Sequence, residues 1–252
     1  MRAASLIAIV LAIGCTKKDN ALPAEEWGAA DYAAANIPAV DHPWTHQEYL
    51  GAAAALTQIG ADHPARLPRY EGARSGAVFA RLLEMPAGDP DAAIAERFLP
   101  HIERYEQINA LSKRYMSNAL APAPREWMEL MGVLLRESIA MQPLVEPFLA
   151  SFGPDDPKAA VRRGGFAKMR SGWGGMIQGG LMMAGDTRVS ETDRIAMVTL
   201  IVHALPHLFP AIPAEKQAAI RELVGKLVTS LPAGKLQSTL VTAQDLIAPK
   251  GP

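Results

Sequence analysis

Residues 164–185 read GGFAKMRSGWGGMIQGGLMMAG, which places eight glycines and four methionines in a segment otherwise typical of a helix. Two sets recur every seven residues: Gly165, Gly172 and Gly179, and Met169, Met176 and Met183. Together they alternate in steps of four and three, which is the spacing of a helix seam. Each glycine destabilises a helix interior by about 1 kcal/mol relative to alanine. We therefore expect neighbouring helices to hold this segment at the centre of the fold.

This Gly/Met seam is open to four interpretations. In packing, glycine admits another helix backbone and methionine fills irregular gaps, and we favour this interpretation. A phosphate loop would need the third glycine of GxGxxG, where Ile177 stands after Gly172 and Gly174. A copper(I) site would need clustered methionines, but residues seven apart lie about 10 Å apart along a helix. The fourth interpretation is an apolar ligand pocket lined by the methionines and Trp173.

The rest of the chain from Pro43 onward also has helical patterning. Alanine, leucine, methionine, glutamate and arginine dominate, and no segment alternates apolar and polar residues as a strand does. The expected helices are 43–59, 75–85, 90–118, 124–150, 157–184, 190–209, 213–231 and 233–247. The sequence therefore predicts an all-α fold, a multi-helix bundle or orthogonal helical array of about eight helices around the Gly/Met-rich helix.

Prolines and caps refine these boundaries. Pro100 is expected to kink or break its helix, and Pro143 and Pro147 are expected to do the same late in the next one. Ser190 with Asp193 resembles a capping box at a helix start. We expect a single domain over residues 41–252, with a possible sub-division at the turn 152–157.

The amino-terminal residues have the pattern of a secretory signal. Met1-Arg2 is followed by an apolar run over residues 3–13, and residues 16–20 are abruptly polar. This run is shorter than the ~20 apolar residues that a membrane-spanning helix needs. We expect residues 1–14 to be a signal peptide and residues 15–40, rich in alanine with Pro23 and Pro38, to be a lipidated tether.

The segment Leu11-Ala12-Ile13-Gly14-Cys15 resembles the lipobox of bacterial lipoproteins, with Ala12 where that class more often has leucine. The resemblance covers only about the first twenty residues. It implies lipid, such as palmitate, on Cys15, and hence export and a membrane anchor. Thr16 is not the aspartate that retains some lipoproteins in the inner membrane, which favours the outer membrane. Cys15 is the only cysteine, so the domain must be stable without an intramolecular disulfide.

Six histidines include two pairs with HxxxH spacing: His42 with His46, and His203 with His207. Residues four apart share a helix face, so such pairs can bind zinc or iron. A proline lies inside each pair, and neither contains the glutamate of HExxH. The alternative to a metal site is a pair of ordinary polar helix ends, where the helix dipole favours cations.

A loop rich in arginine could carry a further site. Arg66, Arg69, Tyr70 and Arg74 lie in the expected loop 60–74, and loops on rigid scaffolds often bind ligands. The loop could hold an anion or a partner, or be salt-bridged and solvated. The chain as a whole has a net charge of −1, which argues against nucleic acid as a partner.

No complete catalytic motif is present, since GxSxG and SxxK are both missing from the sequence. We therefore expect a lipid-anchored cell-envelope protein that acts as a non-catalytic binding or scaffold module. Its partner would be another envelope protein or an apolar ligand, and it would need no cofactor beyond the covalent lipid. The alternative is an exported metal-binding helical protein or metalloenzyme that uses the two histidine pairs.

Overall fold

The computed structural model describes residues 25–117, 123–153 and 155–249. All regular secondary structure in these residues is helical, so the predicted all-α class is confirmed. The expected signal peptide, Cys15 and the tether as far as residue 24 lie outside the described residues.

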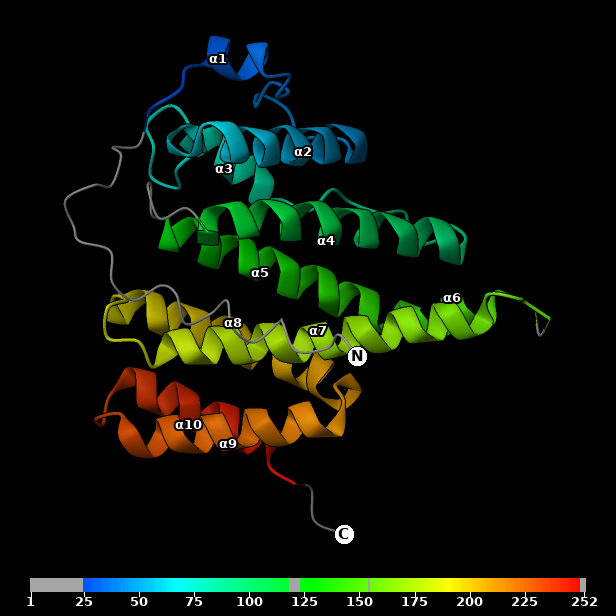
Figure 1. Cartoon of the computed structure of the whole chain (residues 1–252), viewed down its shortest axis with the longest axis vertical. Coiled ribbons are helices and arrows are strands. Elements are labelled where there is room, and N and C mark those ends of the chain that lie inside the picture. The colour runs from blue at the N-terminus through cyan, green and yellow to red at the C-terminus, as the bar shows by residue number, and fades with distance from the viewer. Residues whose placement is uncertain (1–24, 118–122, 154, 250–252) are drawn as a thin grey trace. The chain divides into compact units, whose positions relative to one another are not determined.

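The described chain forms α-helices joined by short connections, three of which are 3-10 turns (Figure 1). The α-helices are α1 (Ala29–Ala34), α2 (His46–Asp62), α3 (Gly76–Leu83), α4 (Ile94–Ser117), α5 (Pro124–Met141), α6 (Val145–Ala150), α7 (Ala159–Ala184), α8 (Glu191–Leu208), α9 (Ala214–Ser230) and α10 (Lys235–Ile247). The 3-10 turns are η2 (Pro64–Arg66), η3 (Gln142–Leu144) and η4 (Phe209–Ala211).

Local sequence signals account for several of these boundaries. Thr45 caps α2 by accepting a hydrogen bond from the backbone N–H of Glu48, whose carboxylate accepts one from Thr45 in return. Ser190 caps α8 by accepting from the N–H of Asp193, as the spacing predicts. Pro143 lies in η3, where α5 ends, whereas α4 continues through Pro100 as one helix.

The chain divides into two compact units. Unit 1 comprises Met1–Glu84 and Ala110–Trp127, and unit 2 comprises Met85–Asn109 and Met128–Pro252. The division falls inside α4 and α5, and the turn 152–157, where the sequence suggests a sub-division, lies within unit 2.

Unit 1 is held together by buried tyrosines whose hydroxyls reach backbone carbonyls. The Tyr49 hydroxyl of α2 donates to the Leu82 carbonyl of α3 at 2.7 Å. The Tyr115 hydroxyl donates to the Pro68 carbonyl at 2.7 Å. Phe79 lies edge-on to Tyr115 with ring centroids 6.0 Å apart. These contacts tie the loop after α2 to the helices around it.

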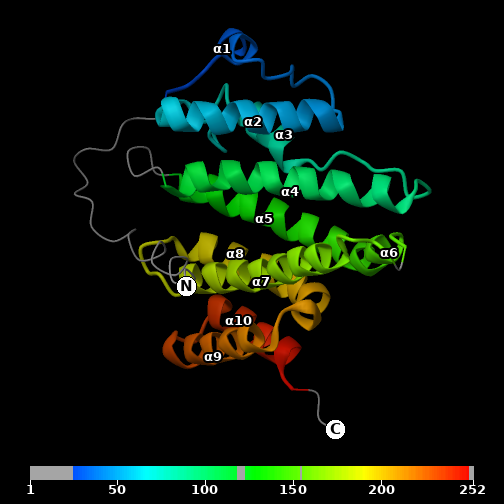
Figure 2. The ribbon, with the colours of Figure 1, turned by 45° about the vertical axis from the view of Figure 1, so that its right-hand side comes forward.

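Unit 2 is built on α7, which packs against α8 and α9, while α10 packs against both α8 and α9 (Figures 1 and 2). Trp173 and Ile177 of α7 are fully buried, and so are Val198 of α8 and Leu240 of α10. Glu191–Ala211 is the one described stretch that is long and apolar enough to cross a membrane by length and composition. Of its most apolar part 39% is buried, and α8 packs against α7 and α10.

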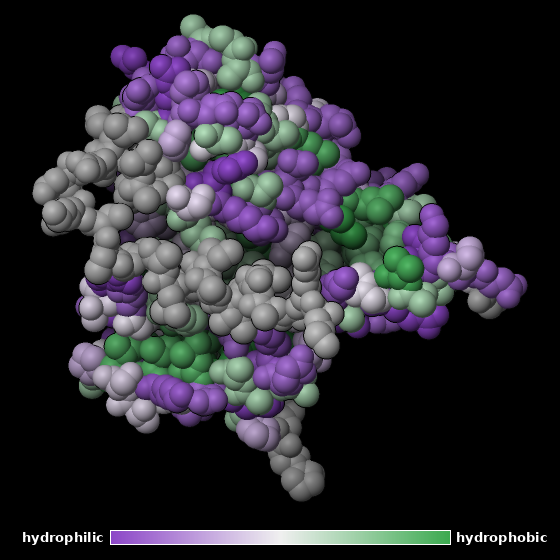
Figure 3. All heavy atoms as spheres, viewed as in Figure 1, coloured by the Kyte–Doolittle hydropathy of each residue, from purple (hydrophilic) through white to green (hydrophobic). Residues whose placement is uncertain are grey.

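A second hydrophobic cluster lies at the end of unit 2 where α4 begins. It contains Phe98 of α4, Met141 of α5, Phe148 of α6 and Phe166 of α7, and the rings of Phe98 and Phe148 are 4.5 Å apart. Hydrophobic side chains also gather on the surface at this end (Figure 3). Partly buried side chains, among them Ile94, Leu149 and Phe152, pack against this cluster and extend it toward the surface.

Candidate functional site

Residues 25–37, which we call the strap, belong to the expected tether but pack on unit 1. The Glu25 backbone N–H donates to the Ala65 carbonyl at 2.9 Å. Tyr32 of α1 and Ile37 are buried, at 4% and 5% exposure. The Trp27 and Tyr32 rings lie 5.2 Å apart. The tether segment is therefore attached to the domain from residue 25 onward.

The Glu26 carboxylate holds the strap to the start of α3. It accepts hydrogen bonds from the backbone N–H groups of Arg74 and Ser75, and from the Ser75 hydroxyl. Burial raises the pKa of Glu26, but these donors lower it more, so the pKa lies below its ordinary value. A Cβ at Gly72 would lie 2.9 Å from a Glu26 oxygen, so glycine leaves room for the carboxylate.

The arginine loop predicted from the sequence contacts the chain's own carboxylates. Arg66 pairs with Glu25, and its guanidinium lies 5.5 Å from the centre of the Trp27 ring. Arg69 Nε and the Tyr70 backbone N–H both donate to the same oxygen of Glu126, at 2.9 and 2.8 Å. Arg74 contributes its backbone N–H to Glu26. In the described residues this loop thus binds anions that belong to unit 1 itself.

A buried charge cluster in unit 2 was not predicted from the sequence. Glu137 of α5 is fully buried, and its two oxygens lie 2.6 Å from His101 Nδ1 and from Arg104 Nε of α4. Arg104 Nη2 also lies 2.9 Å from His101 Nδ1. This triad joins α4 to α5 within unit 2. The His101 ring remains partly exposed, at 19% for its side chain.

The two histidine pairs lie in different units. His42 is exposed and its ring nitrogens lie 3.0 Å from Asp41 and 3.2 Å from Glu48, two carboxylates whose hydrogen bonds raise the pKa of His42. His203 and His207 lie on α8 with ring centroids 6.0 Å apart. Among the described residues, no three histidine, cysteine, aspartate or glutamate side chains converge in a way that could hold a metal ion.

The buried face of α7 is displaced by one residue from the seam predicted from the sequence. A Cβ at Gly165, Gly172 or Gly179 would meet no described atom within 4 Å. The buried face instead carries Phe166, Trp173 and Gly180, which also recur every seven residues. Large apolar side chains decide the phase because their burial contributes most, and glycine has no side chain to bury.

The close helix approaches occur on that buried face. A Cβ at Gly174 would lie 3.0 Å from Lys216 Cβ and from Ile212 Cγ2, and one at Gly180 would lie 2.8 Å from Ile201 Cδ1. The predicted seam residues Met169, Met176 and Met183 are half-buried, and Trp173 is fully buried in the core.

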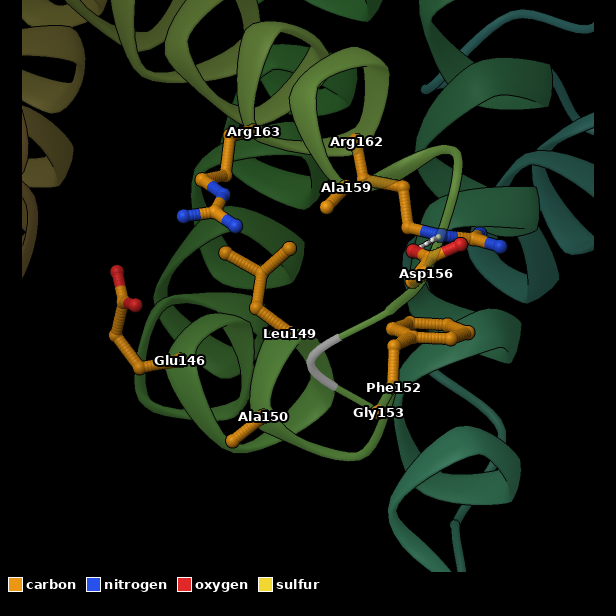
Figure 4. Close-up of a pocket in the computed structure, with 9 residues that line it drawn as sticks. All are labelled: Glu146, Leu149, Ala150, Phe152, Gly153, Asp156, Ala159, Arg162 and Arg163. Carbon is orange, nitrogen blue, oxygen red and sulfur yellow. Dashed lines mark hydrogen bonds and ion pairs between the residues drawn. The ribbon is translucent and has the colours of Figure 1, made fainter.

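A surface hollow of about 310 Å³ lies at the apolar end of unit 2 (Figure 4). Leu149 and Ala150 of α6 and Phe152 after it supply apolar surface. Arg162, from the start of α7, stacks on Phe152 with its guanidinium 3.8 Å from the ring centre and pairs with Asp156 at 3.0 Å. Arg163 and Glu146 also line the hollow and both are exposed, so the hollow combines apolar surface with charged groups of both signs (Figure 4).

Comparison with family models, curated proteins and solved structures found no match to this chain. Its function is therefore argued from its own residues. Those that stand out are Cys15, the strap, the triad around Glu137 and the hollow beside Arg163.

Proposed function

We propose that this protein is a lipid-anchored binding module of the bacterial cell envelope. The observation that carries the proposal is the sole cysteine, Cys15, which stands directly after a short apolar run and within a segment that resembles a lipobox. Two or more acyl chains on that residue would anchor the protein stably, at about 0.8 kcal/mol for each buried CH2. The anchor would confine the helical domain to a membrane surface.

The charged clusters have structural roles within the units, and we take this to support a binding role for the protein. Glu26 fixes the strap to the start of α3, Glu126 fixes the arginine loop, and Glu137 joins α4 to α5. Each cluster therefore has a part in holding one unit together. The apolar end of unit 2 is different, because Leu149 and Phe152, which pack against its hydrophobic cluster, also line the hollow.

A small amphiphilic anion is the ligand we propose for the hollow, with its charge at Arg163 rather than at Glu146, which also lines it. Ligand pockets are commonly apolar cavities of about 300–1,000 Å³ with a few polar groups that orient the ligand. Leu149 and Phe152 would contact the apolar part, and Arg163 would contact the charge. Titration with anilinonaphthalene sulfonate tests this, and we expect Arg163→Ala to weaken its binding. Lys168→Ala on the same helix is the control, and equal loss in both variants would contradict the proposal.

Metabolic labelling with a palmitate analogue tests the anchor. We expect the native chain to be labelled and to enter the membrane fraction, and Cys15→Ser to be unlabelled. A native chain that keeps Met1 and carries no label would overturn the proposal. Metal analysis of the purified protein tests the metalloprotein alternative: stoichiometric zinc, iron or copper that is lost in His203→Ala would favour it.

A further inference from the structure

Two histidines of α8 present their rings on one face of the helix. His203 and His207 are both exposed, and their ring centroids lie 6.0 Å apart. α8 continues through Pro206 as one helix, so the two residues stand one turn apart on the same face. Within the described residues neither ring forms a hydrogen bond or an ion pair with the protein. Their ring nitrogens are therefore open to a ligand from solution.

The other histidines of the described chain do not form such a pair. Carboxylates hold the rings of His42 and His101, at 3.0 and 2.6 Å. His46 has a further contact of its own. His63 is exposed, but no histidine stands three or four residues from it. Among the described residues, the pair on α8 is thus the one place where two unengaged imidazoles share a helix face.

The separation of the two rings suits a shared metal ion. Imidazole nitrogens bind such ions at about 2.0–2.1 Å, and the ring centre lies about 1.1 Å behind the nitrogen, so two rings on one ion have centres at most about 6.4 Å apart. The observed 6.0 Å lies within that limit. Adjacent positions around the ion, at about 90–110°, need centres about 4.5–5.2 Å apart, which a small rotation of the two exposed side chains reaches.

We propose that His203 and His207 bind a Cu²⁺ ion on the surface of unit 2, with water at its remaining coordination positions. Imidazole suits copper, and among the first-row divalent ions Cu²⁺ binds a given nitrogen site most tightly. Both residues lie in the last two turns of α8, where the helix dipole favours a cation. The site depends neither on the lipid anchor nor on the hollow.

This site differs from the metalloprotein alternative, which combines both histidine pairs. A structural metal site closes the coordination shell with four protein ligands. The pair on α8 supplies two, so water occupies the other positions and the ion exchanges with the solvent. We therefore expect Cu²⁺ to bind when it is added to the purified protein, rather than to be retained through purification.

Calorimetric titration of the full chain with Cu²⁺, purified in detergent without a histidine tag, tests the site. Cys15 is blocked with N-ethylmaleimide wherever it is not acylated, because a free thiolate would also bind copper. His203→Ala and His207→Ala should each lower the affinity by about tenfold or more, since even the loss of a supporting residue costs about 10–100-fold. His63→Ala removes an exposed histidine outside the pair and is the control, which should bind as the native chain does.

Moving the second histidine along α8 tests the spacing itself. Thr199 is exposed one turn before His203, so Thr199→His with His207→Ala rebuilds a pair at the same spacing and should restore the affinity. Ala196 is exposed seven residues before His203, about 10 Å along the axis. Ala196→His with His207→Ala keeps the number of histidines but should not restore binding. Circular dichroism checks that each variant keeps its helices.

Three results would overturn the inference. The first is an affinity for Cu²⁺ that is the same in the native chain and in both single variants. The second is a loss in only one of these variants, because a single imidazole would then be the ligand. The third is equal rescue by Thr199→His and Ala196→His, because the helical spacing would then not matter. Nitrogen splittings in the electron paramagnetic resonance spectrum should show two imidazoles on the ion in the native chain and one in either single variant.

Discussion

Substitution of the buried Glu137 should lower the free energy of unfolding strongly. Its carboxylate is fully buried between His101 and Arg104. Glu137→Ala would leave the Arg104 guanidinium buried without its counter-charge, and breaking a buried ion pair in this way costs about 3–5 kcal/mol. We expect the free energy of unfolding, measured with urea and circular dichroism, to fall by this amount.

Glu106→Ala is the matched control for that substitution, because Glu106 lies on the exposed face of the same helix as Arg104. A surface change of this kind is expected to stay within about 0.5 kcal/mol of the native protein. A loss in Glu137→Ala no greater than in the control would show that the triad contributes little.

Because the buried face of α7 differs from the predicted seam, we expect opposite effects on stability from substitutions at Gly172 and Gly174. At Gly174 a larger side chain would collide with Lys216 and Ile212, so Gly174→Leu should destabilise the protein by about 1–3 kcal/mol through overpacking. At Gly172 the space is open among the described residues, so Gly172→Leu should stabilise α7 by up to about 1 kcal/mol. Thermal unfolding distinguishes them, and a large loss at Gly172 would restore the seam predicted from the sequence.

The sequence pattern could have indicated the buried triad of His101, Arg104 and Glu137. Glu137 stands on the apolar stripe of α5 that contains Leu130, Val133 and Leu134, and Arg104 stands between the buried Phe98 and Ile108 on α4. A charge on such a stripe implies a buried partner. The identity of the partner could not be predicted, because the contact joins residues more than thirty positions apart.

Among the elements, the strap is one whose stability should depend on acid pH. The folded pKa of Glu26 lies below its ordinary value of 4.5. Its contribution is therefore fully present above the unfolded pKa and is lost as the pH falls through the folded pKa. We expect hydrogen-exchange protection of residues 26–37 to decrease below about pH 4.5. Glu26→Gln should weaken that protection at neutral pH and flatten its pH dependence, and an unchanged acid profile in this variant would contradict the role of Glu26.

The helices were predictable because their signals are local. Caps such as Ser190 and breaks such as Pro143 act on the backbone within a few residues, and the expected helices match the observed ones closely. The packing of the strap on unit 1 was missed because its composition resembles a linker. Its anchoring side chains, Tyr32 and Ile37, are isolated in sequence, and their burial depends on unit 1. The buried face of α7 was predicted incorrectly because two sets of residues, one beginning at Gly165 and one at Phe166, both recur every seven residues.

At the scale of the whole molecule, neither the proposed anchor nor the fold can depend on an intramolecular disulfide. Cys15 is the only cysteine, and the proposed lipid occupies its sulfur. The domain must therefore be stabilised by helix packing and by the buried charge clusters alone. Any effect of lipidation on the domain would have to pass through the residues between Cys15 and the docked strap.

Thr16 gives the last prediction at this scale, since the residue after the acylated cysteine directs sorting in the class that Cys15 resembles. Aspartate there retains some lipoproteins in the inner membrane, so we expect native protein in the outer-membrane fraction and Thr16→Asp in the inner-membrane fraction. Thr16→Ser, which keeps the hydroxyl, should behave as the native chain. Density-gradient separation of the two membranes measures this. Native protein found only in the inner membrane would contradict the outer-membrane placement without affecting the anchor, because both destinations require the same lipid on Cys15.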